Sequence, residues 1–171
     1  PSREDPRDVL VVRPDVLTGQ GSLDVLPSGA RVGTSSLRRS AQVRAARPDL
    51  RVAPVRGNVD TRLRKLEAGE FDALILAAAG LKRLGLWSSS IFPLETNWLS
   101  APGQGALGGQ GRSDDHSMQE LVRPLEDATA RAEVNAERSL LASLEGGCQV
   151  PIAAGARVEG SVLRLAAAVY D

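Results

Sequence analysis

Arginines gather between residues 32 and 64, where they follow small polar residues. Thr34, Ser35 and Ser36 precede the pair Arg38-Arg39, and Arg56, Gly57 and Asn58 precede Arg62. Each group has the form of a loop that leads into a helix. Arginines in a first helical turn are unfavourable, because they meet the positive end of the helix dipole. A bound anion, held by helix N-termini and guanidinium groups together, explains the pattern best.

A third group of the same kind follows Gly80, with Lys82 and Arg83. The candidates for anion binding are therefore Arg38, Arg39, Arg56, Arg62 and Arg83. A solvated charged face is the alternative for any single arginine, and we assign Arg44, Arg47 and Arg64 to it. Several separate arginines suit a ligand with many carboxylates better than one phosphate, because guanidinium forks select such oxygen pairs. The sequence has no GxxxxGK[ST] phosphate loop.

The single cysteine, Cys148, stands in the run EGGCQVP. A buried small apolar residue is the usual role of a lone cysteine, but the two glycines before it would let a ligand approach the sulfur. A cysteine hydrolase would need a base, and the only histidine, His116, lies in a polar segment. Covalent attachment of an electrophilic ligand to Cys148 needs no such base.

Composition narrows the class of partner. The 171 residues carry no formal net charge, yet residues 31–65 hold ten basic and two acidic residues, against eleven and nineteen elsewhere. A local basic cluster in a neutral chain with 3% aromatic residues favours a small anionic ligand over nucleic acid. One cysteine and one histidine argue against a disulfide or a zinc site. No membrane span or signal-peptide core is evident. We expect a cytoplasmic protein without metal, membrane or nucleic-acid partners.

The hydrophobic pattern predicts an α/β fold. Expected strands cover residues 9–12, 30–33, 50–55 and 71–78, and expected helices cover residues 37–46, 60–67 and 81–84. Alternation at this spacing predicts parallel βαβ units in an open sheet. Ligands of such sheets lie beyond the carboxyl ends of the strands, where all three basic groups fall. Residues 1–8 and 86–100 are expected to be exposed loops, and the glycine-rich residues 101–111 have the composition of a linker.

The last third predicts a separate α+β unit. A helix is expected at residues 116–122, interrupted by Pro124, and a longer one at residues 128–144 with Asp127 as its N-cap. Its apolar face would carry Ala132, Ala136, Leu140 and Leu144. Strands at residues 152–158 and 162–169 would form a hairpin around residues 159–161.

Four runs carry a resemblance to a known family: VGTSSLRRSAQVRAARPDLR, VRGNVDTRLRKLEAGEFDALILAAAGLKRLGL, APGQGALG and LEGGCQVPIA. They resemble hydroxymethylbilane synthase, also called porphobilinogen deaminase, and the similarity extends from Arg3 almost to the C-terminus. The resemblance implies a monomeric, cytoplasmic transferase of porphyrin and haem biosynthesis. Its reaction would condense four porphobilinogen units head to tail, with release of ammonia, into the linear tetrapyrrole hydroxymethylbilane.

The resemblance also implies a site. A dipyrromethane cofactor would be joined to Cys148 by a thioether and would prime the growing chain. The residues that match the family's cofactor contacts are Thr34, Ser36, Arg38, Arg39, Gly57 and Asn58, and those that match its substrate contacts are Arg56, Arg62 and Arg83. Since every pyrrole carries an acetate and a propionate, the growing chain is the polycarboxylate that the arginines predict.

The implied fold is a βαβ domain like a lobe of periplasmic binding proteins, followed by a small α+β domain with an antiparallel sheet. Residues 1–9 would be a hinge segment from the first domain, 10–98 the second domain, 99–113 a strand returning to the first, and 114–171 a truncated third domain. The family's catalytic aspartate has no counterpart, so we expect a fragment that is inactive alone. Gly109 and Gln110 also replace the family's usual Ile-Glu or Val-Glu. A non-catalytic module that binds a polycarboxylate or oxyanion remains the alternative.

Overall fold

Five short strands form the main sheet of the computed structural model, which describes residues 1–18, 22–95, 97–144 and 150–171. In spatial order these strands are β3 (Arg51–Ala53), β2 (Arg31–Gly33), β4 (Ala73–Ala77), β1 (Asp8–Val12) and β5 (Ile91–Pro93). β2 pairs in parallel with both β3 and β4, whereas β1 pairs antiparallel with β4 and β5.

The predicted parallel sheet is therefore confirmed for three strands and wrong for β1. All residues of β1 are buried, as its apolar run predicts. A strand that is buried on both faces can pair in either direction, so its hydrophobic pattern does not show whether the pairing is parallel or antiparallel. β5 falls in residues expected to be a loop. Its three residues end in Pro93, and they are too few to show an alternating pattern.

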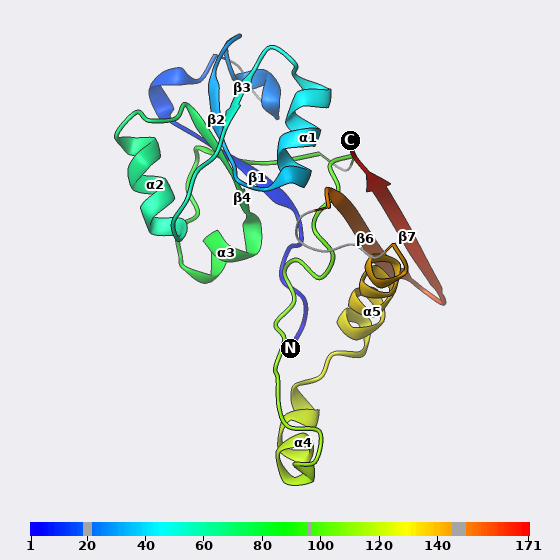
Figure 1. The fold of residues 1–171 in the computed structure, drawn as a ribbon. Helices are drawn as coiled ribbons and strands as arrows, with labels where there is room; N and C mark the ends of the chain where they lie inside the picture. Colours follow the sequence, from blue (N-terminus) through cyan, green and yellow to red (C-terminus); the bar gives the residue numbers. More distant parts are fainter. Residues whose placement is uncertain (19–21, 96, 145–149) are drawn as a thin grey trace.

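Helices cover both faces of the main sheet (Figure 1). Alternate residues of β1 and β4 enter two apolar cores: Leu10 and Ile75 pack with Val43 of α1 (Leu37–Ala46) and with the 3-10 helix η2 (Leu23–Val25). The second core joins the other side chains of β1 and β4 to α2 (Val59–Glu67) and α3 (Ala78–Arg83). Another 3-10 helix, η1 (Pro14–Val16), follows β1.

The third junction differs from its prediction. α3 begins at Ala78, directly after β4, so Gly80 lies inside the helix and Lys82 and Arg83 lie in its last turn. Cations are favourable there, because the negative end of the helix dipole faces them. The expected helix start at residue 81 is wrong because the alanines after β4 suit a helix as well as the end of a strand.

The C-terminal part forms a small α+β unit. α5 (Ala128–Ser143) packs on the antiparallel hairpin of β6 (Ile152–Glu159) and β7 (Val162–Val169), as predicted. α4 (His116–Val122) and the 3-10 helix η3 (Arg123–Leu125) extend away from the main sheet (Figure 1). None of the described helices is long and apolar enough to cross a membrane.

The predicted apolar face of α5 is only partly confirmed. Ala136 and Leu140 are half-buried, but Ala132 and Leu144 are exposed, and the fully buried residue of the helix is Glu137. Asp127 caps the helix as expected, since its side chain accepts a hydrogen bond from the backbone N–H of Ala130. A four-residue apolar spacing therefore failed in part here because a buried charge with distant partners occupies the packed face.

Residues 1–8 and 101–111 lie side by side, and the expectation for each of these two segments is wrong. Residues 1–8 are not simply exposed, since Asp8 is fully buried and the N–H of Glu4 bonds to the carbonyl of Gly105. Residues 101–111 form neither the implied strand nor an unattached linker. Residues 102–105 make tight turns, and the side chain of Gln104 donates to the carbonyl of Pro6 at 2.7 Å.

Candidate functional site

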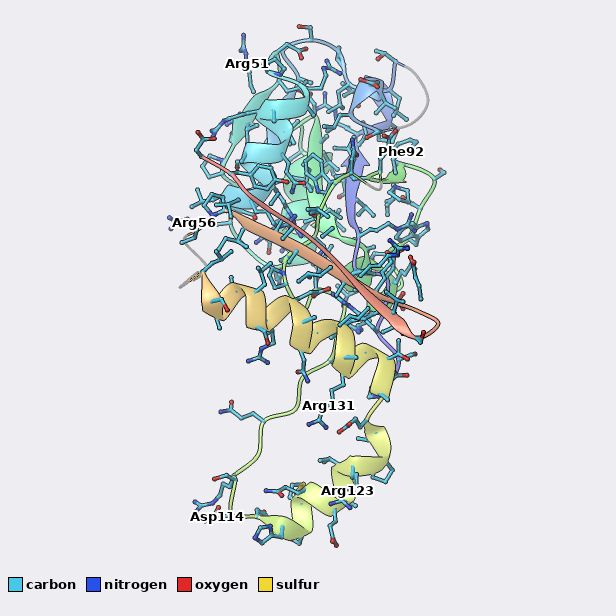
Figure 2. All side chains as sticks on the ribbon, turned by 90° about the vertical axis from the view of Figure 1, so that its right-hand side faces the viewer. Arg51, Arg56, Phe92, Asp114, Arg123 and Arg131 are labelled. Atoms are coloured by element: carbon cyan, nitrogen blue, oxygen red, sulfur yellow. The ribbon has the colours of Figure 1, made fainter. Side chains whose placement is uncertain are left out.

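The three basic junctions leave the main sheet at one edge, because β2, β3 and β4 run in parallel. The first two are in contact: the Ser35 hydroxyl donates to the Val55 carbonyl at 2.8 Å and accepts from the Val55 N–H at 3.1 Å. Figure 2 shows Arg56 just beyond the end of β3, far from Arg51 at its start. The sequence prediction of a shared edge is confirmed for these junctions.

Several predicted site residues shape the backbone of these junctions. Ser36 is the N-cap of α1 and accepts from the N–H of Arg39 at 3.4 Å, and the buried Thr34 accepts from the N–H of Ser36 through its hydroxyl. Asn58 is the N-cap of α2 and accepts from the N–H of Thr61 at 2.9 Å. Gly57 has a φ of 114°, in the region that favours glycine. These four residues therefore build the two helix starts, whatever else they bind.

The inner arginines, Arg38 and Arg39, converge on the carboxylate of Asp8. Arg38 donates to Oδ2 at 2.7 Å, and Arg39 donates to Oδ1 through Nη2 at 2.7 Å and Nε at 3.1 Å. Trp98 Nε1 and Gln104 Nε2 add hydrogen bonds of 2.9 and 2.8 Å to the same carboxylate. We call these five residues the Asp8 cluster. The anion beside the first junction is thus, in part, an internal one.

Burial and charge act in opposite directions in the Asp8 cluster. Burial alone would raise the pKa of Asp8, but the positive charges of Arg39 and Arg38 outweigh it, so the pKa lies below its ordinary value. Burial also lowers the pKa of Arg38, against the attraction of Asp8. The carboxylate is ionised at neutral pH, and two guanidinium charges against one carboxylate leave a net charge of about +1.

Asp8 is not among the site residues that the sequence predicts, although the sequence around Asp8 contains one indication of its role. Asp8 is a charged residue next to the apolar run VLVV, and a buried charge needs partners. Its partners are 30 or more residues away in sequence, so spacing could not identify them. At the third basic junction, Lys82 precedes the candidate Arg83 and forms a salt bridge with the Glu4 carboxylate at 3.1 Å.

The outer arginines, Arg56, Arg62 and Arg83, are placed differently. Arg62 Nε donates to the carbonyl of Gly57 at 2.8 Å, and Arg83 Nη2 donates to the carbonyl of Gly105 at 2.7 Å. Within the described residues, none of the three forms a salt bridge with a carboxylate. Three guanidinium groups without a salt-bridge partner in the described part of the chain suit an external polycarboxylate.

Gln104 connects the Asp8 cluster to the C-terminal unit. Its backbone carbonyl accepts from Arg3 Nε at 3.0 Å, and Arg3 forms a bidentate pair with the buried Glu137 of α5 at 2.8 and 2.9 Å. Glu137 also accepts from the N–H groups of Gly103 and Ala156. A continuous set of hydrogen bonds thus runs from the start of α1 to α5 and β6.

Cys148 lies outside the described residues, in the connection between α5 and β6, so the structure does not test its placement beside the arginines. A hollow of about 400 Å³ lies elsewhere, next to Arg47, Trp98 and Tyr170. It does not include any of the predicted site residues. No group of three His, Cys, Asp or Glu side chains suited to a metal occurs among the described residues.

Comparison with known proteins decides the family. Residues 1–120 match the family model described as "Porphobilinogen deaminase, dipyromethane cofactor binding domain", and residues 131–171 match "Porphobilinogen deaminase, C-terminal domain". The chain belongs to the porphobilinogen deaminase family. It therefore contains the region that the family model assigns to the dipyrromethane cofactor.

Relatives in the porphobilinogen deaminase family are similar over almost the whole chain. The porphobilinogen deaminase of Roseiflexus sp. (strain RS-1) is 54% identical over 166 residues, which are 96% of this chain and 53% of the relative. That of Syntrophobacter fumaroxidans is 53% identical over 171 residues, covering 99% of this chain and 53% of the relative. The chain thus spans about half the length of the curated relatives it matches.

A solved structure shows a weaker likeness. A Salmonella typhimurium periplasmic binding protein, described for its high arginine specificity, matches with a TM-score of 0.40 and 12% identity. The match covers 83% of this chain and 63% of that protein.

Proposed function

We propose that this chain is the part of a porphobilinogen deaminase that holds the dipyrromethane cofactor and the growing pyrrole chain. The whole enzyme is a transferase that condenses four porphobilinogen units head to tail, with release of ammonia, into the tetrapyrrole hydroxymethylbilane. The observation that carries this proposal is the set of outer arginines, Arg56, Arg62 and Arg83, which form no salt bridge with a carboxylate of the described residues. Family membership supports it.

The residues have separate roles in this proposal. Cys148 holds the cofactor through a thioether, and when bound the cofactor supplies the pyrrole carbon on which new units are added. Thr34, Ser36, Gly57 and Asn58 present the backbone N–H groups of two helix starts, which suit carboxylates. Arg38 and Arg39 add a net positive charge near the first helix, and Arg56, Arg62 and Arg83 bind carboxylates of the substrate.

We further propose that the chain alone is inactive, because the aspartate that assists condensation in the family has no counterpart in it. Residues 1–9 then act as a hinge segment, 10–98 as the second domain, 99–113 as the return segment and 114–171 as part of the third domain. The enzyme works as a monomer in the cytoplasm, which agrees with a single cysteine in a reducing compartment.

Mass and activity measurements test this proposal. Intact-mass analysis of the active full-length enzyme should show the added mass of a dipyrromethane, and the Cys148→Ser variant should show neither this mass nor turnover. A second control is the isolated 171-residue chain, which keeps Cys148 but should release no ammonia from porphobilinogen. An unmodified thiol in active enzyme would refute the cofactor assignment, and turnover by the isolated chain would refute its inactivity.

The same variant separates this function from the alternative of a non-catalytic polycarboxylate-binding module. Such a module would keep its affinity for a polycarboxylate after Cys148→Ser, and it would need no covalent modification for function. The synthase variant would lose its primer and all product formation. Retention of product formation would therefore exclude the role of Cys148.

A further inference from the structure

Asp8 occupies a position that simple charge attraction does not explain. Its carboxylate is fully buried and is the only acidic group among the described residues that pairs with Arg38 or Arg39. An arginine pair that served only to attract anions would bind them more strongly without a neighbouring carboxylate. Asp8 therefore reduces the attraction for an anionic ligand while it fixes the two guanidinium groups.

We propose that Asp8 is a positioning residue of the anion site: it fixes the orientation of Arg38 and Arg39 so that ligand carboxylates meet prearranged donors. This inference rests on the proposed function and deepens it. Orientation is a real problem here, because two adjacent cations in a first helical turn repel each other and the helix dipole. Without Asp8, both side chains would gain freedom to turn towards solvent.

The hydrogen bonds of Arg38 and Arg39 support this positioning role of Asp8. Arg39 uses three nitrogens within the protein, because its Nη1 also donates to the carbonyl of Ile75 at 3.1 Å. Within the described residues, Arg38 donates only through Nη1, towards Asp8 and the carbonyl of Leu99. Its side chain is 5% exposed. Asp8 thus holds one edge of Arg38, and the other edge forms no hydrogen bond with the described residues.

Gln104 extends this positioning to the rest of the molecule. Its amide donates to Asp8 Oδ1 at 2.8 Å and its Oε1 accepts from Arg39 Nη2 at 3.3 Å, while its backbone carbonyl accepts from Arg3. The arginine pair is therefore fixed relative to the Arg3–Glu137 pair of α5, the helix that precedes Cys148. Replacement of Gln104 changes no charge, so it isolates geometry from electrostatics.

The test is calorimetric titration, at neutral pH, of the 171-residue chain carrying Cys148→Ser with a synthetic dipyrromethane that bears acetate and propionate groups. Three variants are compared with it: Asp8→Asn, Gln104→Leu and the control Asp49→Asn. The control removes a bidentate partner of Arg47, with bonds of 2.8 and 2.7 Å, at the opposite end of α1. Circular dichroism verifies that each protein is folded at the titration temperature.

Positioning predicts that Asp8→Asn weakens binding by about tenfold, although it removes a negative charge, because misplacing donors by about 1 Å can cost that factor or more. Gln104→Leu should weaken it by a smaller factor, and Asp49→Asn should leave it unchanged. Tighter or unchanged binding by Asp8→Asn would overturn the inference alone. If that variant does not fold, unchanged binding by Gln104→Leu overturns it. Absence of binding by the parent chain would overturn the proposed function as well.

Discussion

At the scale of residues, the arginines of this chain divide into two classes that the sequence does not distinguish. Arg38 and Arg39 bond to a buried carboxylate, whereas Arg56, Arg62 and Arg83 have no carboxylate partner among the described residues. The inner pair is therefore part of the folded core as well as of the proposed anion site. Substitutions in the two classes should have different consequences: the inner class affects stability and binding together, and the outer class affects mainly binding.

Asp8 should also make stability depend on pH. Its pKa is lowered in the folded protein, so its stabilising contribution is present above its unfolded pKa of about 3.9 and is lost as pH falls through the lower folded value. Asp8→Asn should reduce the free energy of unfolding by about 3–5 kcal/mol at pH 7, because it leaves two cations without their partner. The difference between variant and parent should shrink below about pH 4.

Urea denaturation between pH 2.5 and 7 measures this dependence. Asp49→Asn is again the control, since Asp49 is solvent-exposed in its pair with Arg47 and its substitution should cost much less. An equal cost of Asp8→Asn at every pH would show that packing, and not the ionised carboxylate, accounts for its effect.

At the scale of elements, the sequence predicted the bounds of helices and of the hairpin better than it predicted how strands pair. The helices at residues 37–46 and 116–122 match their predicted bounds, because Ser36 and Asp115 cap them. The hairpin β6–β7 also follows from its pattern, with Gly160 at a φ of 62° in its turn. The direction of β1 and the buried residues of α5 depend on contacts between residues far apart in sequence, whereas α3 starts early because the alanines after β4 suit a helix as well as the end of a strand. Contacts between residues far apart in sequence produce no periodic pattern of hydrophobic residues.

The candidate site was predictable from the sequence only as far as local patterns determine it. Small polar residues followed by arginines predict two helix starts and an anion, and both starts are found with their caps. Residue types alone could not show that Asp8 lies within hydrogen-bonding distance of two of the arginines. Nor could they show that the third group, with Lys82 and Arg83, ends a helix instead of starting one.

The turn at residues 102–105 gives a sharp prediction for an element that composition describes as a linker. Gly105 has a φ of 86°, and a Cβ there would lie within 3.0 Å of the Glu4 carbonyl oxygen. Gly105→Ala should therefore lower the free energy of unfolding by more than about 2 kcal/mol. Thermal unfolding compares it with Gly108→Ala, which has open space and should change stability by less than about 1 kcal/mol. Equal effects would restore the linker interpretation.

At the scale of the whole molecule, an ion pair between Arg3 and Glu137 connects the N-terminal segment to the C-terminal unit. Arg3 precedes the main sheet, and Glu137 lies on α5, yet Glu137 is fully buried and accepts two bonds from Arg3 and one each from Gly103 and Ala156. The C-terminal unit is thus attached to the main-sheet unit through a charge that is satisfied only when both are folded. Apolar contacts would hold the units together less specifically.

Glu137→Gln should therefore separate the unfolding of the two units. The variant keeps the shape of the side chain but leaves Arg3 without a full counter-charge, which costs about 3–5 kcal/mol for a buried pair. The matched control is Glu133→Gln on the same helix, because Glu133 reaches Arg3 only at 3.4 Å and is less buried. In urea, the parent and the control should unfold in one transition. Glu137→Gln should show an earlier loss of helical signal, with the fluorescence of Trp98 in the Asp8 cluster, isolated by Trp87→Phe, changing later. Coincident transitions in Glu137→Gln would mean that other contacts suffice to join the units, and that the pair contributes stability without coupling them.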